Sequence, residues 1–318
     1  MSTSKVLPLF SFISLIIVLF SLLTRYSVLA HSNSEQISHS FGFIDHLKGC
    51  HKGDKVRGIH ELKKYLEAFG YLNYNNYFKS QTHATDDDFD ELLEFAIKTY
   101  QLNYHLKSTG VLDEKTIGMM EKPRCGVADI INGTTRMRSG QSGQQNNGSS
   151  HFHTVAHYAF FKSSPKWPAS KFNLTYAFLQ GTRDDAKDPI ARAFHTWAAN
   201  TPFKFSQIQD YNVADIKIGF YSGDHGDRVP FSSLYGALAH AYPPSDGRLH
   251  FNADQAWDVG ANKGLYDLET TALHEIGHLL GLGHSSVEDA LMYATLPAGV
   301  TKGLHGDDIQ GIKDLYDL

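Results

Sequence analysis

Residues 274–284, HEIGHLLGLGH, contain three histidines whose spacing suits the binding of one metal ion. The stretch that leads into them has apolar residues at helical intervals, so a helix is expected there. His274 and His278 are four residues apart and therefore share one face of that helix. In an unbroken helix, His284 would lie about 15 Å further along the axis than His274, beyond the reach of a shared ion. The helix must therefore end before the third histidine.

Gly281 is the expected end of this helix, because glycine accepts the left-handed backbone conformation that terminates helices. Beyond that turn, His284 can return toward the other two imidazoles. Three neutral imidazoles with one open position are typical of a catalytic zinc site rather than a closed structural one. Glu275 follows the first ligand and would lie beside the metal, where it can accept a proton from zinc-bound water. The pattern predicts zinc-assisted hydrolysis with Glu275 as the general base.

The elements that must position these residues form two sections of different texture. Residues 31–129 contain three segments with helical periodicity, VRGIHELKKYLEAFGYL, DFDELLEFAIKTYQLNYHL and LDEKTIGMM, which predict a small helical domain. Residues 130–150 are rich in Gly, Ser, Gln and Asn, which predicts a flexible linker that a protease can cut. In residues 151–318, the β-rich segments FNLTYAFL, DIKIGFY and RLHF alternate with amphipathic helices. This order predicts an α+β domain that carries the metal helix.

Composition and the two ends of the chain limit its partners and compartment. The 318 residues are 42% hydrophobic with a net charge of −5, which suits two domains and argues against nucleic acid as a partner. Residues 1–30 have a positive start, an apolar run and small residues at the end, which predicts a cleaved signal peptide, with a membrane anchor as the alternative. No GPI anchor is expected, because the carboxyl end lacks an apolar tail. Asn132, Asn147 and Asn173 begin acceptor triplets for N-glycosylation.

Several segments together resemble the matrixins of the metzincin clan. The zinc-binding pattern described above matches the metzincin signature, Met292 in ALMYATL fits its methionine turn, and Ser285 after the third histidine resembles the matrixins. PRCGVAD at 123–129, called here the switch segment, is similar to the matrixin cysteine switch. The helical start, LKGCHKGD and the missing hemopexin domain resemble the plant matrix metalloproteinases. The resemblance covers residues 41–318 and implies a metzincin-like catalytic domain, a twisted mixed sheet with helices, behind a three-helix prodomain.

The same resemblance implies an activity and a setting. The protein would be a monomeric zinc endopeptidase, secreted to the apoplast or cell wall, that cleaves extracellular proteins or peptides. It would be made as an inactive precursor that another protease activates. The helical prodomain also resembles peptidoglycan-binding modules, so the alternative function is a non-catalytic, cell-wall-binding protein with a zinc fold.

The switch segment carries the implied inhibition of the precursor. By resemblance, Cys125 would occupy the fourth position of the catalytic zinc and exclude water, while Arg124 and Asp129 would pair to hold the loop. Ala128 stands where the family usually has proline. A disulfide between Cys50 and Cys125 is the alternative, since exported proteins permit disulfides, and it would consume the switch thiol.

A second, structural zinc is implied by HGDRVPF, LAHAYPP and RLHF. His225 and Asp227 would face the same way in an extended segment, and with His240 and His250 they would saturate a tetrahedral zinc. Family members hold calcium beside this zinc with acidic residues. At the corresponding positions this chain has Ser232, Asn252 and Gln255, and the remaining carboxylates are Asp215 and Asp254. Because calcium prefers carboxylate ligands, the expectation is a weakened or lost calcium site.

The substrate groove is also implied by the resemblance. Leu238 and Ala239 lie in the expected edge strand, to which an extended peptide can add a strand. An apolar pocket for the residue after the scissile bond would be lined by Leu273, His274 and the LMYATLPAG loop with Tyr293. Met292 would pack beneath the zinc site.

Overall fold

The computed structural model describes residues 44–74, 84–131, 134–135, 157–232 and 235–318, all within one compact unit, residues 43–318. The predicted signal peptide at 1–30 and the candidate glycosylation sites Asn132 and Asn147 lie outside the described residues. Asn173 is exposed at the start of a strand. In the part of the chain that the structure describes, none of the helices combines the length and apolar character needed to cross a bilayer.

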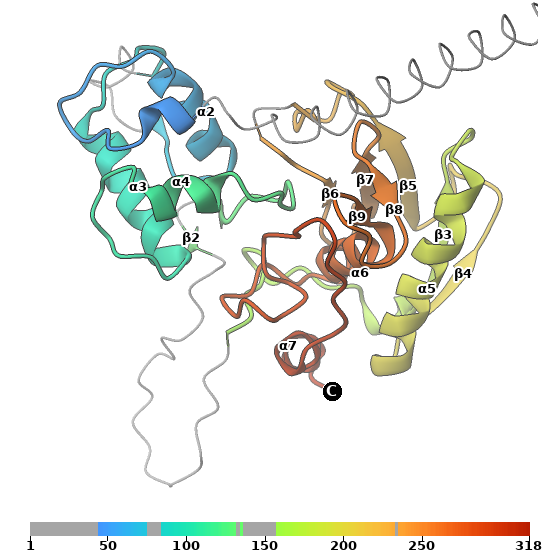
Figure 1. The fold of residues 1–318 in the computed structure, drawn as a ribbon. Coiled ribbons are helices and arrows are strands. Elements are labelled where there is room, and N and C mark those ends of the chain that lie inside the picture. The colour runs from blue at the N-terminus through green and yellow to red at the C-terminus, as the bar shows by residue number, and fades with distance from the viewer. Residues whose placement is uncertain (1–43, 75–83, 132–133, 136–156, 233–234) are drawn as a thin grey trace, which may run out of the picture. The chain divides into compact units, whose positions relative to one another are not determined.

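The three predicted helical segments form the helices of the amino-terminal section (Figure 1). The elements are the 3-10 helix η2 (Asp45–Leu47) and the α-helices α2 (Ile59–Ala68), α3 (Glu91–Asn103) and α4 (Glu114–Met120). Asp90 and Asp113 cap α3 and α4, because each side chain accepts a hydrogen bond from a main-chain N–H three residues later, at 2.8 Å. A short antiparallel pair follows, formed by β1 (Ile130–Ile131) and β2 (Thr134–Thr135), inside the stretch predicted as a linker.

One mixed five-stranded sheet forms the frame of residues 157–318. Its strands are β3 (Asn173–Phe178), β4 (Lys204–Gln207), β5 (Ile216–Tyr221), β6 (Ala239–Ala241) and β7 (Arg248–Asn252), in the spatial order β4-β3-β5-β7-β6. Four strands are parallel, and β6 runs antiparallel to β7 at the edge. The α+β prediction is confirmed, and β6 has a sheet strand on one side only, so its other side can pair with an extended segment.

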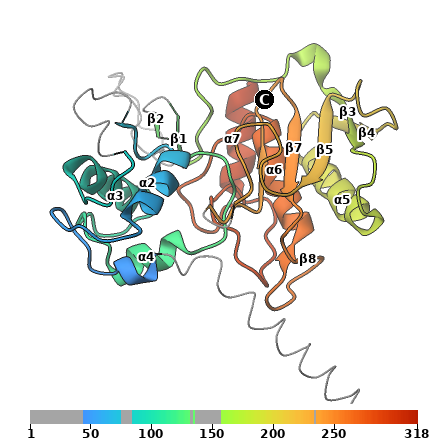
Figure 2. The same cartoon turned by 90° about the horizontal axis from the view of Figure 1, so that it is seen from above.

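Two helices pack against the sheet and against each other (Figure 2). They are α5 (Asp184–Asn200) and the metal helix α6 (Leu268–Leu279). Trp197 of α5 is fully buried and donates from its ring nitrogen to the Leu273 carbonyl at 2.8 Å, which joins α5 to α6. The remaining elements are the 3-10 helix η5 (Ala169–Lys171), the strand pair β8 (Trp257–Asp258) and β9 (Tyr266–Asp267), and the last helix α7 (Gly306–Tyr316).

Helix α6 ends as the sequence predicts. Asp267 caps its start by accepting from the Thr270 N–H at 2.8 Å, and Gly281 just after its end has φ of +105°. A Cβ atom on Gly281 would lie 2.4 Å from the Pro165 carbonyl oxygen and 2.8 Å from the Leu315 side chain. Both the backbone conformation and the space around it therefore require glycine.

Replacing Gly281 with alanine is expected to lower the free energy of unfolding by about 1–3 kcal/mol, because the left-handed conformation is strained for any side chain. Urea unfolding of the precursor followed by circular dichroism measures this change. Gly306→Ala is the matched control, since Gly306 begins α7 without a left-handed φ and a Cβ there meets nothing within 4 Å. Equal stability of the Gly281→Ala variant and its parent would contradict this account of the turn.

Candidate metal centres

The three histidines of the predicted zinc site converge in the structure. His274 and His278 lie on α6, and His284 returns to them after the turn at Gly281. All three rings are fully buried, with ring centroids 4.9–5.5 Å apart. Together with Cys125 they form a group whose ligand atoms all lie within 4.8 Å of one another. Sequence-distant side chains thus meet at one buried point.

Hydrogen bonds orient each imidazole toward that point. The Nδ1 atoms face three acceptors at 2.7–2.8 Å, namely the Leu291 carbonyl for His274, the Leu282 carbonyl for His278 and the Asp129 carboxylate for His284. Because a carbonyl can only accept, Nδ1 of His274 and His278 must donate, which leaves the Nε2 lone pairs for the cluster. The buried Nε2 of His274 has no hydrogen-bond partner among the described residues.

Burial also favours the protonation state in which the histidines can bind a metal ion. It lowers the pKa of His274 to about 3, which keeps the ring neutral and its Nε2 lone pair available. A buried lone pair that faces no donor, beside two more imidazoles and a thiol, fits a zinc ion. The donor set of this cluster therefore suits zinc with nitrogen and sulfur ligands.

Cys125 lies against the histidines and not against Cys50. Its buried Sγ is 3.4 Å from Nε2 of His278, and both cysteines of the chain are free. The alternative of a Cys50–Cys125 disulfide is therefore wrong. In the protein without metal, burial and the nearby Glu275 carboxylate raise the pKa of the Cys125 thiol well above its ordinary value. A zinc ion reverses this effect, because a coordinating thiol loses its proton.

The switch segment lies between the edge strand and the loop that follows Met292. Its main chain is hydrogen-bonded on both sides, at 2.8–3.0 Å: Gly126 N–H to Ala239 O, Leu238 N–H to Arg124 O, Cys125 N–H to Ala294 O and Leu296 N–H to Pro123 O. Leu238 and Ala239, predicted to bind substrate, therefore hold the switch segment in this structure. An extended substrate cannot pair with the same atoms while the segment is present.

Arg124 and Asp129 form a buried ion pair, with 2.7 Å between Nη2 and Oδ1. The guanidinium also lies over the Phe69 ring, 3.6 Å from its centroid. Burial alone would raise the pKa of Asp129, but Arg124 and His284 together hold it well below its ordinary value. The switch segment thus carries a fixed negative charge beside the third histidine.

Glu275 and Met292 are both buried close to the histidine cluster. The Glu275 carboxyl is completely buried on α6, and burial raises its pKa to about 8. Met292 is buried against α6, so closely that a Cβ on Gly277 would lie 2.3 Å from the methionine sulfur. Sequence reasoning missed the role of Asp308, whose buried carboxylate accepts hydrogen bonds from the N–H groups of Leu291 and Met292 at 3.0 Å. The sequence indicates that Asp308 lies in the first turn of a helix, but it does not show which N–H groups its carboxylate accepts from.

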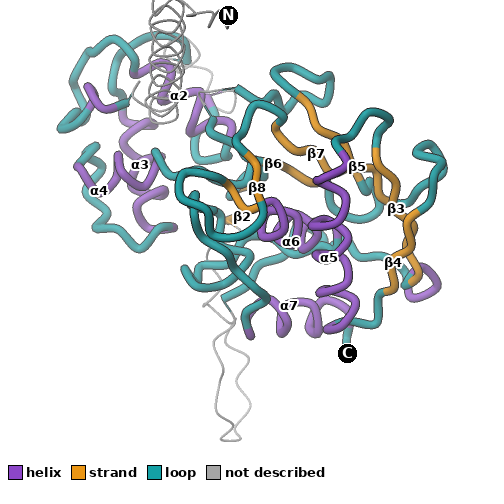
Figure 3. The backbone as a smooth tube through the Cα atoms, turned by 45° about the vertical axis from the view of Figure 1, so that its right-hand side comes forward, coloured by secondary structure: helices purple, strands orange, loops and turns teal. Residues whose placement is uncertain are grey.

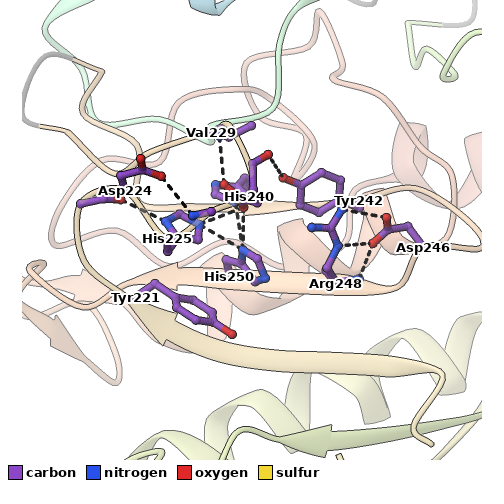
Figure 4. Close-up of polar contacts among 12 residues, drawn as sticks. Tyr221, Asp224, His225, Val229, His240, Tyr242, Asp246, Arg248 and His250 are labelled. Atoms are coloured by element: carbon purple, nitrogen blue, oxygen red, sulfur yellow. Dashed lines mark hydrogen bonds and ion pairs between the residues drawn. The ribbon is translucent and has the colours of Figure 1, made fainter. Parts of the chain in front are cut away.

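A second group of possible metal ligands consists of His225, Asp227, His240 and His250. The first two lie in the loop between β5 and β6, drawn in teal in Figure 3, and the others lie on the adjacent strands β6 and β7. His240 and His250 are directly opposite in the register of that strand pair. The three imidazoles point toward one another (Figure 4). The pairing of β6 with β7 therefore brings two of the four possible ligands together.

The distances within this second group match a tetrahedral ion. Oδ2 of Asp227 lies 2.8–2.9 Å from a ring nitrogen of each histidine, and the His250 nitrogen lies 3.1–3.2 Å from the other two. Ligands at about 2.0 Å from a tetrahedral zinc are about 3.3 Å apart. Burial lowers the pKa of His250 to about 4. Burial alone would raise the pKa of Asp227, but hydrogen bonds from His240 and the Val229 N–H hold it well below its ordinary value. Neutral imidazoles and a charged carboxylate are the forms that bind zinc.

The carboxylates expected to remain for calcium do not lie together. Asp215, just before β5, accepts from Thr175 and pairs with Lys171, whereas Asp254 accepts from Ser222, just after β5. A strand of this length separates them by about 20 Å. Neither belongs to a group of ligand side chains within the described ranges. The side chain of Asn252 is used inside the protein, since it donates to the Ala237 carbonyl at 3.0 Å.

The structure describes one small cavity beside the first turn of α6. It has a volume of about 10 Å³ and is lined among others by Tyr266, Thr270, Thr271, Leu296, Val300 and Lys302. Tyr293 is buried and instead packs edge-on against Tyr104 of the helical section, with centroids 6.1 Å apart. Leu296 and Pro297 of the predicted LMYATLPAG loop line this cavity, whereas Leu273, His274 and Tyr293 do not, so the substrate pocket stays a prediction.

The chain is similar to known proteins over most of its length. Residues 166–317 match the matrixin family profile, and residues 56–120 match a peptidoglycan binding domain profile. Metalloendoproteinase 5-MMP of Arabidopsis thaliana is 43% identical over 85% of this chain and 74% of its own length. Metalloendoproteinase 1 of Glycine max is 41% identical over 84% of this chain and 85% of its own length. Matrilysin of Homo sapiens is 34% identical over 81% of this chain and 87% of its own length.

Proposed function

Because this chain belongs to the matrixin family and is a metalloendopeptidase with a cysteine-switch prodomain, we propose that it is secreted as an inactive precursor that cleaves extracellular proteins after processing. The single observation that carries the proposal is the contact between Cys125 and the three buried histidines. A hydrolase whose metal site is blocked by its own chain must be processed before it can act on a substrate.

In the processed enzyme, His274, His278 and His284 hold the catalytic zinc. When bound, the ion supplies a Lewis acid that acidifies a water molecule and polarises the substrate carbonyl. Glu275 accepts a proton from the attacking water and then delivers it to the leaving amine. Its position on α6, directly after the ligand His274, supports this role, because its carboxylate lies beside the metal site where the water would be held.

In the precursor, the switch segment blocks the site in two ways. Cys125 takes the ligand position that water needs, and the main chain around it uses the hydrogen bonds that a substrate would make with Leu238 and Ala239. We assign residues 1–30 to a signal peptide, 31–129 to the prodomain, 130–150 to a linker that holds the activation cut, and 151–318 to the catalytic domain. Met292, Arg124 and Asp129 support the site rather than react.

The setting and partners follow from the same proposal. The processed enzyme acts as a monomer on extracellular proteins or peptides in the apoplast or cell wall, after an activating protease has cut the linker. Asn132, Asn147 and Asn173 are its candidate glycosylation sites, and the net charge of −5 argues against a nucleic-acid partner. The main chain at Leu238 and Ala239 pairs with the extended switch segment, which supports a groove where an extended peptide can pair once that segment is removed.

The second histidine group is proposed to bind a structural zinc through His225, Asp227, His240 and His250. All four ligand positions of a tetrahedral ion are then filled by protein, so this zinc has no place for water. A calcium ion beside it is weakly held or absent, because the nearby positions lack the carboxylates that calcium prefers.

Replacing Asp227 with asparagine is expected to remove the structural zinc, because three imidazole nitrogens then lose the carboxylate that contacts each of them. Metal analysis should fall from two zinc ions per chain to one, and the unfolding midpoint should drop by several degrees, for a loss of about 1–3 kcal/mol. Asp224→Asn is the matched control, since Asp224 lies in the same loop and, within the described ranges, its side chain accepts from the Gly226 N–H at 3.0 Å rather than from the histidine group. Two zinc ions retained in the Asp227→Asn variant would refute the assignment.

Activation of the purified precursor tests the function as a whole. Limited proteolysis or a mercurial compound should produce activity against casein or a quenched peptide, and a zinc chelator should abolish it until zinc is restored. The same samples should be tested for sedimentation with wall polysaccharide. Polysaccharide binding without any peptide hydrolysis would favour the alternative of a non-catalytic wall-binding protein.

A further inference from the structure

The three imidazoles of the catalytic site differ in what orients them. His274 and His278 donate from Nδ1 to the Leu291 and Leu282 carbonyls, which belong to the catalytic domain. His284 instead faces a carboxylate oxygen of Asp129 at 2.8 Å, which belongs to the switch segment. One of the three zinc ligands is therefore oriented by a residue that leaves the enzyme when the precursor is cut.

A network of hydrogen bonds holds the Asp129 carboxylate in place for this contact. Its Oδ1 atom also accepts from Arg124 at 2.7 Å, and its Oδ2 atom accepts from Tyr71 at 2.7 Å and Tyr104 at 3.2 Å. Asp129, Arg124 and the third zinc ligand have exposed fractions of 1% or less, so water does not weaken these contacts. Every donor except His284 comes from the prodomain or the switch segment.

We propose that Asp129 is a positioning residue for the catalytic zinc in the precursor, so that the switch segment raises zinc affinity through His284 as well as through Cys125. This inference rests on the proposed function of the histidine site. A carboxylate that accepts from the far nitrogen of a metal-bound imidazole fixes the orientation of the ring and increases its basicity. Such outer partners typically contribute about 10–100-fold to metal affinity.

Processing would then change the zinc site in two steps at once. Removal of the switch segment opens the position of Cys125 for water, and it also takes the carboxylate partner away from His284. The precursor is accordingly the form in which the site is loaded with zinc, and the processed enzyme holds the same ion less tightly than loss of the thiolate alone would explain.

A competing explanation gives Asp129 a purely mechanical role. In that case the pair with Arg124 only holds the loop, and any loss of zinc after mutation would come from misplacement of Cys125. The two explanations predict different effects on zinc affinity when Cys125 has already been replaced. A mechanical role then has no thiolate left to position, whereas the hydrogen bond to His284 still acts on the metal.

Zinc dissociation constants of the full-length precursor test the proposal, measured by competition with a chromogenic chelator. All variants carry Glu275→Gln, so that no precursor processes itself. Asp129→Asn and Arg124→Met are compared in the Cys125 background and again in a Cys125→Ser background, with near-ultraviolet circular dichroism to confirm folding. Zinc binding is read without any hydrolysis, so a failure here is distinct from a failure of the proposed activity.

The expected result in the Cys125→Ser background is about 10–100-fold weaker zinc binding for Asp129→Asn, and a smaller change for Arg124→Met, which leaves the Asp129–His284 contact in place. Equal zinc affinity of Asp129→Asn and its parent in that background would overturn the proposal.

A second measurement needs no substitution at Asp129 and therefore does not depend on the folding of that variant. Histidine-labelled precursor should show an Nδ1–H proton resonance of His284, typical of a hydrogen bond to a carboxylate, that is lost or strongly shifted on removal of the prodomain. The resonances of His274 and His278, which donate to carbonyls of the catalytic domain, serve as internal controls. An unchanged His284 resonance after processing would also overturn the proposal.

Discussion

Replacing Glu275 with glutamine is expected to lower kcat for peptide hydrolysis by about 10²–10⁴-fold in the processed enzyme, with zinc still bound. Glutamine keeps the shape of the side chain but cannot accept a proton from the attacking water. The rate loss should therefore appear in kcat and not mainly in KM.

The assay compares casein or peptide hydrolysis with zinc content measured by elemental analysis on the same samples. Glu269→Gln is the matched control, because Glu269 lies on the same helix but its carboxylate pairs at the surface with Arg192 at 2.7 Å. That variant should retain the parental rate. Cleavage by the Glu275→Gln enzyme at the parental rate would show that another group is the base.

Replacing Cys125 with serine should make the unprocessed precursor active. A neutral hydroxyl is a much poorer zinc ligand than a thiolate, so water gains access to the metal. If the zinc–thiolate bond contributes about 3 kcal/mol to the closed state, its loss raises the open population by roughly 100-fold. Some inhibition should persist, because the switch segment still pairs with β6 and with the loop after Met292.

The measurement is peptide hydrolysis by intact precursor, with gel analysis to exclude processing during the assay. Cys50→Ser is the control, since Cys50 is the other buried free cysteine and is not part of the histidine cluster. Its precursor should stay latent and should activate normally. Latency of the Cys125→Ser precursor equal to that of the parent would mean that pairing of the main chain alone blocks the site.

Local spacing carried most of the site prediction. The distance of four residues between His274 and His278 places both on one helical face whatever surrounds them. Gly281 ends the helix because its backbone adopts a left-handed conformation that glycine, having no side chain, accepts without strain. Caps at Asp113 and Asp267 are equally local, since each bonds to an N–H three residues away. Such features depend on the chain within one or two turns, and so the sequence is enough to predict them.

Resemblance extended the prediction to contacts that spacing does not define. It pointed to Cys125 as a neighbour of the histidines and to the grouping of His225 with His250, which no periodicity links. The disulfide with Cys50 was the alternative that composition left open, and only the position of the thiol against His278 excluded it. The expectation of a weak calcium site likewise came from the absence of carboxylates in the sequence. That Asp215 and Asp254 are far apart became clear only from the length and direction of β5, which lies between them.

The tertiary structure alone decided the environment of each ligand. Asp129 and His284 are 155 residues apart in sequence but share a hydrogen bond, and Asp308 supports the turn at Met292 from the next helix. These partners come from whichever elements pack nearby, and packing depends on the whole chain. The amino-acid order therefore determines which residues can bind zinc and move a proton, because that capacity lies in side-chain type and short spacing. Orientation, burial and charge around them arise only when distant segments exclude water from the same point.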